Sequence, residues 1–297
     1  MAISPAHKFG QIVGGMLEEA INPFLESFSR EHGLYLDRKG RRPARSGTKV
    51  RWTDVYGNRH DLDFVLERGG SPDHIGTPVA FIETAWRRYT KHSRNKAQEI
   101  QGAIQPLAAT YKNAAPFIGV ILAGVFTEGA IKQLQSLGFA VLYFPYETIV
   151  KAFGRVGISA KFDEVTPDAE SARRVRAWRA LSAGKRRSVA VALVKLNDGR
   201  IQSFLDALRK SATRQIEQIY VLPLHGASAR IATIEEAIQY VERYDEGRPE
   251  NRLVRYEVRI VYSNGDRIEG QFKDKESAIA FLQGYRAPQL HSVPARR

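Results

Sequence analysis

The sequence predicts a mixed α/β protein, in which helices flank a mixed central sheet and a smaller α+β domain follows. Residues 49–67, in which polar residues are interleaved with β-branched and aromatic ones, and the largely apolar residues 78–86 predict antiparallel strands. A strand, a helix and a strand between residues 117 and 146 predict a parallel pair, because a crossover of this length joins parallel strands. The part of the chain after residue 210 holds a weak internal repeat. A chain of 297 residues, 43% of them apolar, is long enough for both domains.

The chain begins with an amphipathic helix, and a basic loop follows it. Between residues 9 and 29 apolar side chains recur at helical spacing, and Pro23 is expected to kink this helix or to divide it. Residues 37–51 hold basic side chains together with Gly and Pro, which indicates a loop. Three arginines of this loop are candidates for contact with DNA phosphates: Arg41, Arg42 and Arg45. A loop that is merely solvated is the alternative.

Acidic residues lie on the next predicted strands. Residues 49–67 are expected to form a hairpin, and residues 78–86 a further strand. Because side chains alternate along a strand, Asp61 and Asp63 share one face. If the strands are neighbours, Asp63 and Glu83 converge at one edge of the sheet. Two carboxylates placed together are what a hard cation such as Mg²⁺ requires.

A basic run without acids follows the second strand and leads into a helix: Arg87, Arg88, Lys91, Arg94 and Lys96. Phosphate beside a metal site is the expected ligand, so Arg87, Arg88 and Arg94 are further candidates for DNA contact. Downstream, the strand at 117–126 is apolar on both faces, as a central strand would be. Thr127 is placed to cap the helix after it.

Asp63, Glu83 within the sequence FIETA, and the basic helix that follows resemble the core of the PD-(D/E)XK nuclease superfamily, which includes many type II restriction endonucleases. The resemblance covers about half of the chain. It implies a central sheet of the restriction-endonuclease-like type, with Mg²⁺, or Mn²⁺ as a substitute, held by Asp63 and Glu83. It also implies hydrolysis of phosphodiester bonds in double-stranded DNA, with a homodimer as the expected assembly. Glu18 and Glu19 would support the metal site, as in some members of the family, or else are solvated helix charges.

One position departs from the family pattern. The residue two after the second acid is usually Lys in that family, and here it is Ala85. Lys91 or Lys96 could reach back from the following helix and take its catalytic role, whereas Arg87 could stabilise charge but not exchange a proton, because its guanidinium is permanently charged. If neither does, the alternative is a non-catalytic DNA-binding or regulatory protein on the same core.

The composition changes after residue 161, so three parts are expected. These are a nuclease-like core at 1–161, a basic helical connector at 162–210 and a strand–strand–helix repeat domain at 211–297. The connector lies on a phosphate backbone or packs through Val175, Trp178 and Leu181. The repeat domain reads bases, mediates dimerisation or covers the sheet.

The composition indicates the class of binding partner and excludes several kinds of functional site. The formal net charge of +13 favours a polyanionic partner, with nucleic acid first. The chain has no Cys, which excludes disulfides and thiolate zinc sites and fits the cytoplasm. No stretch is long enough to span a membrane. His60 and His74 lack the spacing of zinc ligands, and neither a phosphate-binding P-loop nor a Gly-x-Ser-x-Gly elbow is present.

Overall fold

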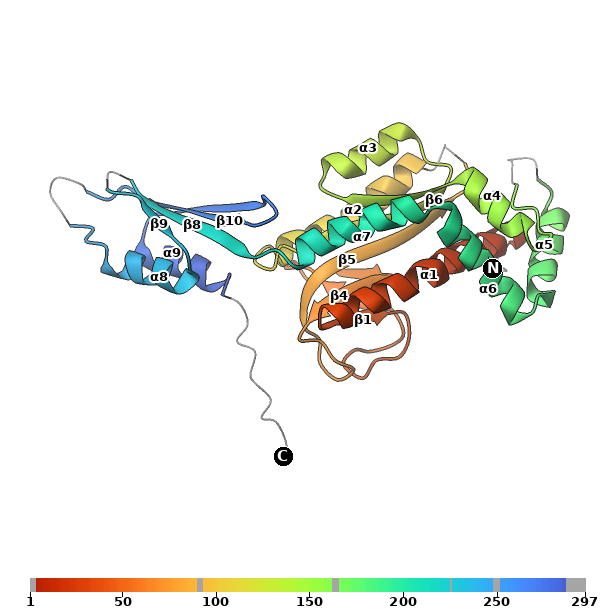
Figure 1. The fold of residues 1–297 in the computed structure, drawn as a ribbon, viewed down its shortest axis with the longest axis horizontal. Helices are drawn as coiled ribbons and strands as arrows, with labels where there is room; N and C mark the ends of the chain where they lie inside the picture. Colours follow the sequence, from red (N-terminus) through yellow and green to blue (C-terminus); the bar gives the residue numbers. More distant parts are fainter. Residues whose placement is uncertain (1–3, 90–92, 162–165, 225, 248–251, 287–297) are drawn as a thin grey trace, which may run out of the picture. The chain divides into compact units, whose positions relative to one another are not determined.

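The computed structural model describes residues 4–89, 93–161, 166–224, 226–247 and 252–286. The chain divides into two compact units, 1–212 and 213–297 (Figure 1), and each has an apolar core of its own. The mixed α/β class expected from the sequence is confirmed. Among the helices described, none is both long and apolar enough to cross a membrane.

The first unit is built on a five-stranded sheet with the strand order β1-β4-β5-β6-β7. The strands are β1 (Leu34–Arg38), β4 (Phe64–Arg68), β5 (Thr77–Arg87), β6 (Phe117–Gly124) and β7 (Ala140–Pro145). The pairs β1·β4 and β4·β5 are antiparallel, whereas β5, β6 and β7 run parallel. The predicted parallel pair is therefore confirmed. Strand β1 was not predicted, because its last residues are charged and belong to the segment assigned to the basic loop.

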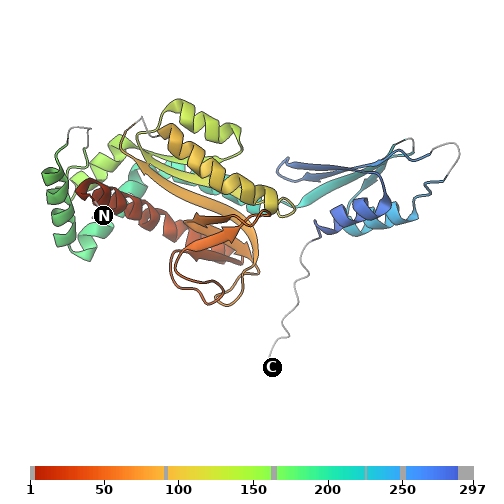
Figure 2. The ribbon, with the colours of Figure 1, turned by 180° about the vertical axis from the view of Figure 1, so that it is seen from behind.

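Helices cover both faces of this sheet (Figures 1 and 2). One face packs against α1 (Pro5–Glu31), α4 (Tyr146–Gly154) and α7 (Asp198–Ala212), and α5 (Asp168–Ala180) and α6 (Ala183–Leu196) pack on α1. The other face packs against α2 (Ser93–Thr110) and α3 (Glu128–Ser136). Strand parity decides which core each side chain enters, so Ile82 faces α1 while Phe81 and Ala85 face α2. Thr127 caps α3 as expected, since its hydroxyl accepts a hydrogen bond from the N–H of Ala130.

Helix α1 is longer than the pattern predicted and passes through Pro23 without ending. Its first turn carries Pro5, whose missing N–H costs nothing there, and the hydroxyl of Ser4 accepts a hydrogen bond from the N–H of His7. The buried stripe from Phe9 to Phe28 packs across the sheet beside β1 and β5. A single continuous helix therefore runs past the predicted acids.

The predicted hairpin forms, but its second strand divides. Strands β2 (Val50–Thr53) and β3 (Arg59–Leu62) make a separate two-stranded sheet, and β4 leaves the hairpin to join the main sheet. Asp63 lies at the break between β3 and β4. Asp61 instead lies within β3 and forms ion pairs with Lys49 and Arg51. The expectation that Asp61 and Asp63 share a strand face is therefore wrong.

The segment assigned to a connector packs onto the core. Helices α5 and α6 contact α1, and α7 contacts β7, so residues 168–212 belong to the first unit. Val175 and Trp178 are buried in the α1-side core, as one of the two expected arrangements required. The division between units falls after Ala212.

The second unit contains the predicted repeat. Its antiparallel sheet has the order β11-β10-β8-β9, with β8 (Ile216–Pro223), β9 (Ala229–Ile231), β10 (Tyr256–Tyr262) and β11 (Arg267–Phe272). Each strand pair is followed by a helix, α8 (Ile234–Arg243) or α9 (Lys275–Gln283). Both helices contribute to one core with β8 and β10. The hairpin turn at Gly265 has φ +88°, a conformation that favours glycine.

Candidate metal and phosphate site

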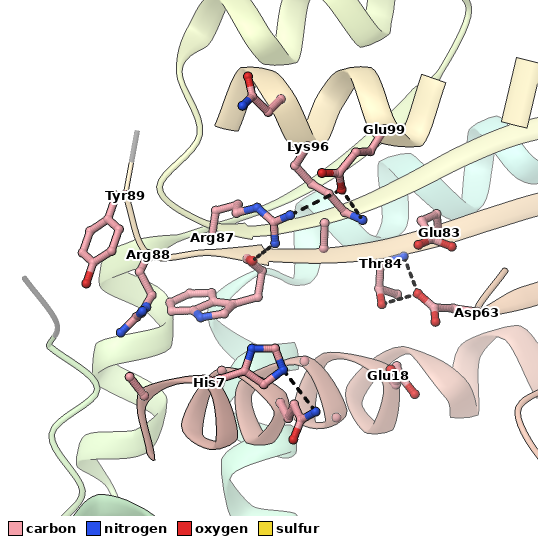
Figure 3. A pocket seen from close by; sticks show the side chains of 18 of the residues that line it. His7, Glu18, Asp63, Glu83, Thr84, Arg87, Arg88, Tyr89, Lys96 and Glu99 are labelled. Carbon is pink, nitrogen blue, oxygen red and sulfur yellow. Dashed lines mark hydrogen bonds and ion pairs between the residues drawn. The ribbon is translucent and has the colours of Figure 1, made fainter. Parts of the chain in front are cut away.

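The two predicted acids come together where β4 begins. Phe64 of β4 pairs with Ile82 of β5 in an antiparallel register, so Asp63 lies opposite Glu83. One Asp63 oxygen, Oδ2, accepts hydrogen bonds from the N–H of Thr84 at 2.7 Å and from its hydroxyl at 2.5 Å (Figure 3). The Asp63 carboxylate is thereby fixed at the edge of β5 by its cross-strand neighbour.

Glu83 is a half-buried carboxyl in an unfavourable electrostatic position. Burial and the nearby charges of Asp63 and Glu18 raise the pKa of Glu83 to about 8, although Lys96 and the Asp63 N–H act in the opposite direction. Its Oε2 atom is buried and has no hydrogen-bond partner among the residues that the structure describes. A buried acceptor without a partner is costly, and it is the group that a bound cation or proton would satisfy.

A third carboxyl, that of Glu18, belongs to the same site. Burial raises the pKa of Glu18, the charge of Asp63 raises it further, and Lys39 lowers it. In Figure 3 Asp63 is drawn between Glu83 and the α1 residue Glu18. The helical pattern alone could not assign Glu18, because its meeting with Asp63 depends on how α1 crosses the sheet.

The acids fit a hard cation in chemistry but do not form a complete set of metal ligands. Within the described ranges no group of three or more His, Cys, Asp or Glu side chains is arranged to hold a metal ion. Two facing carboxyls, Asp63 and Glu83, and the unpartnered Oε2 atom are suitable oxygen ligands for Mg²⁺. The remaining ligands of such an ion would have to come from water or substrate.

The position of the missing lysine is filled by packing. Ala85 is 5% exposed and lies in the apolar cluster on the α2 side, with Phe81 and Ile100 among its members. A lysine at 85 would start inside that cluster. The burial of position 85 could not be predicted from the sequence, because the sequence does not show which helix covers the strand.

Of the proposed replacements, Lys96 lies at the site. It lines the same cavity as Glu83 and lowers the pKa of that carboxyl, while its Nζ lies 3.2 Å from Glu99 Oε2. Lys91 lies outside the described residues. Lys39, directly after β1, lines the cavity as well and was missed, because the sequence placed it among many loop cations.

A cavity of about 980 Å³ surrounds the acids, within the first unit. Its walls are the N-terminal half of α1, the end of β5 and the start of α2. Three cationic side chains line it besides the lysines: His7, when protonated, Arg87 and Arg88. Arg87 lies 3.6 Å from Glu99 Oε2 and donates to the carbonyl of Trp86. The cavity therefore combines half-buried acids with basic side chains along its walls (Figure 3).

Two arginines predicted to contact DNA form buried ion pairs within the protein instead. Arg42 is 4% exposed, and its guanidinium donates to both Glu67 oxygens and to the carbonyls of Ser71 and His74, with Asp37 at 2.9 Å. Arg45 is likewise held by Asp37. The assignment of Arg42 and Arg45 to DNA contact is corrected accordingly, because neither guanidinium reaches a phosphate without breaking these pairs.

The other predicted DNA contacts remain on accessible surface. Arg41 is exposed in the loop, and Arg94 is exposed on the first turn of α2. Glu67, the buried partner of Arg42, was not singled out from the sequence, since its role depends on a loop partner 25 residues away. The ring of His60 pairs with the buried Asp54, at 3.0 Å.

Comparisons with known proteins add little. No family model and no curated protein matches the chain. It is similar to a solved structure described as a protein of unknown function, AF1548, with 14% identity over 62% of this chain and 99% of that one. The TM-score of that superposition is 0.28, so it carries no argument about fold or function.

Proposed function

We propose that the protein is a metal-dependent DNA endonuclease, of the restriction type that the resemblance to PD-(D/E)XK nucleases implies. The observation that carries the proposal is the pairing of Asp63 with Glu83 in a cavity with basic side chains along its walls, where Glu83 Oε2 is buried without a partner among the described residues. Buried carboxyls with a strongly shifted pKa are typical of functional sites. The proposed substrate is double-stranded DNA and the proposed setting a cytoplasmic homodimer, and the charge of +13 supports the choice of substrate.

Each residue has a role in this proposal. Asp63 and Glu83 would hold Mg²⁺ or Mn²⁺, with Glu18 adding negative charge. The cation, when bound, would activate water and offset charge on the leaving oxygen. Thr84 fixes the Asp63 carboxylate through two hydrogen bonds, and Lys96 carries an ammonium into the same cavity. Arg87, Arg88 and Arg94 would hold phosphates near the acids.

A cleavage assay with a neighbouring control variant tests the proposal. Supercoiled and genomic DNA are incubated with Mg²⁺ or Mn²⁺, and Asp63→Asn is expected to lower the cleavage rate by at least about a hundredfold. Asp61→Asn is the matched control, because Asp61 lies two residues away but pairs with Lys49 and Arg51 on the hairpin. Equal activity in the wild type and Asp63→Asn would sink the assignment.

A second candidate function is a non-catalytic DNA-binding or regulatory protein. Two observations favour it: Ala85 is packed where the family has lysine, and the ammonium of Lys96 is already paired with Glu99. A DNA-binding measurement does not discriminate between the two functions, since both predict that this basic protein binds DNA in a salt-sensitive manner. Calorimetry with DNA present does: no Mg²⁺ or Mn²⁺ uptake favours the regulator, whereas uptake that Glu83→Gln removes favours the enzyme.

A further inference from the structure

The acids lie where two cavities meet. A second cavity, of about 790 Å³, shares Gly15, Glu18, Lys39 and Asp63 with the one described above. Its far wall is α6, through residues such as Arg187 and Val191. A small molecule or a chain terminus needs room on one side of the reacting group only. Room on both sides suits a polymer that continues past it.

One wall of the first cavity is a bare stretch of α1, which reaches the second cavity at Gly15. Gly10, Gly14 and Gly15 line the first cavity, and a Cβ added at Gly14 or Gly15 would meet no atom within 4 Å. Glycine inside a helix is unfavourable, and one use of it is to let a ligand approach the backbone closely. The glycine face therefore provides width next to the acids.

A polar group beneath this face lacks an acceptor. Trp86 is 9% exposed and lines the first cavity, and its Nε1 atom has no hydrogen-bond partner within the described ranges. A Cβ added at Gly10 would lie 3.9 Å from this atom. Buried indole N–H groups usually find an acceptor, so this one indicates a ligand oxygen on the Gly10 side of the cavity.

Cations flank the acids in both directions. Arg87 and Arg88 line the first cavity, while Lys39 and Arg187 line the second. The positive side chains thus extend along one path from the end of β5, past Asp63, to α6. A phosphate backbone crossing the acids would meet a cation on each side.

We propose that one strand of the substrate passes across the acids along the glycine face of α1 and continues between α1 and α6. The inference rests on the proposed function and deepens it, because it names the surface that the strand follows on each side of the acids. Arg187, on a helix outside the expected nuclease core, becomes a contact for the phosphates beyond the cleavage point.

Binding measured without divalent cation tests this path separately from cleavage. Fluorescence anisotropy of a labelled strand, alone and in a duplex, is compared for the wild type, Gly15→Leu and Gly102→Leu. Gly102 is the matched control, a helical glycine with nothing within 4 Å that lines neither cavity. Leucine favours helix, so both variants should keep the thermal stability of the wild type. Gly15→Leu is expected to weaken binding about tenfold or more, and Gly102→Leu by less than about twofold.

Two further experiments test whether Arg187 contacts phosphates and whether binding needs a free strand end. Arg187→Glu is expected to lower the salt dependence of binding more than Arg173→Glu, which makes the same charge change on the exposed surface of α5. A closed single-stranded circle should compete as well as a linear strand of the same sequence. Unchanged affinity in Gly15→Leu, equal effects of the two arginine variants, or failure of the circle to compete would overturn the path. Absence of any DNA binding by the wild type would overturn the proposed function itself.

Discussion

Glu83 shows how a single position on a strand sets the chemistry of the site. Its neighbours of the same parity, Phe81 and Ala85, enter the apolar core under α2, and this burial raises the pKa of Glu83 most. The charges of Asp63 and Glu18 raise it further. Near neutral pH the carboxyl is therefore largely protonated, and the proposed cation would have to compete with that proton.

The pKa of Glu83 gives a prediction for stability. Its folded-state value, about 8, lies above the ordinary 4.5, so the native protein keeps a proton that the unfolded chain loses. The free energy of unfolding should fall as the pH rises from about 4.5 to about 8, and outside that window the contribution of this group should not change with pH. Glu83→Gln should remove this pH dependence. The melting temperature of the variant minus that of the wild type should therefore increase as the pH rises through this window. The exposed Glu19→Gln is the control, and parallel curves for Glu83→Gln and the wild type would contradict the assignment.

The place of a single residue could be predicted from the sequence where it depends only on the neighbouring residues of its strand. The convergence of Asp63 and Glu83 follows from strand parity and one strand pairing. Glu18 and Lys39 meet the site only because α1 and β1 cross or border the sheet there. Such meetings depend on tertiary packing, which no local pattern encodes.

At the scale of elements, the loop between β1 and β2 is ordered by buried charge. Arg42 and Arg45 hold Asp37 on β1, and Arg42 also binds Glu67 on β4, so the loop is tied to two neighbouring strands. Tyr35 on β1 stacks against the Arg42 guanidinium at 4.2 Å. The density of arginines that suggested DNA contact is partly explained by this internal network.

Breaking that network should be costly. Arg42→Met leaves the buried Glu67 without its arginine and Asp37 with Arg45 alone, and the expected loss of unfolding free energy is about 3–5 kcal/mol. The neighbouring Arg41 is exposed, so Arg41→Met should change stability by less than about 0.5 kcal/mol. Urea unfolding at neutral pH measures both values. A loss below about 1 kcal/mol in Arg42→Met would show that the pairs contribute little.

Most helices and strands could be predicted from the spacing of apolar residues, whereas the point at which one strand ends and the next begins could not. The long helix, the strands β5 to β7 and the two-copy repeat were each indicated by spacing and capping residues. The division at Asp63 was hidden, because β3 and β4 are contiguous in a pattern that suits one strand. Only the competing pairings, β3 with β2 and β4 with β1 and β5, separate them.

At the scale of the whole molecule, the helices after residue 161 complete the first unit. Trp178 of α5 and Leu193 of α6 are buried against the core that α1 forms with the sheet. A boundary at 161, suggested by the change in composition, would expose this core. Charge and low hydropathy in that segment belong to its outer face, and composition averages the two faces together.

Fragments test where the boundary lies. A fragment of residues 1–212 is expected to unfold cooperatively with native-like helix content, because the apolar core of the first unit lies within it. A fragment of residues 1–161 should aggregate or unfold without cooperativity, since α5, α6 and α7 no longer cover the α1 side. Thermal melts followed by circular dichroism compare them. Equal cooperativity in both fragments would contradict the packing role of these helices.

The measurement that tests the account most directly is the location of Mn²⁺ by anomalous scattering in crystals soaked above pH 8, where Glu83 is ionised. We expect a peak between the carboxylates of Asp63 and Glu83 in the wild type, and none at that place in crystals of Glu83→Gln. A peak that persists in Glu83→Gln, or a wild-type map with no peak between these two carboxylates, would contradict the metal site on which the proposed nuclease depends.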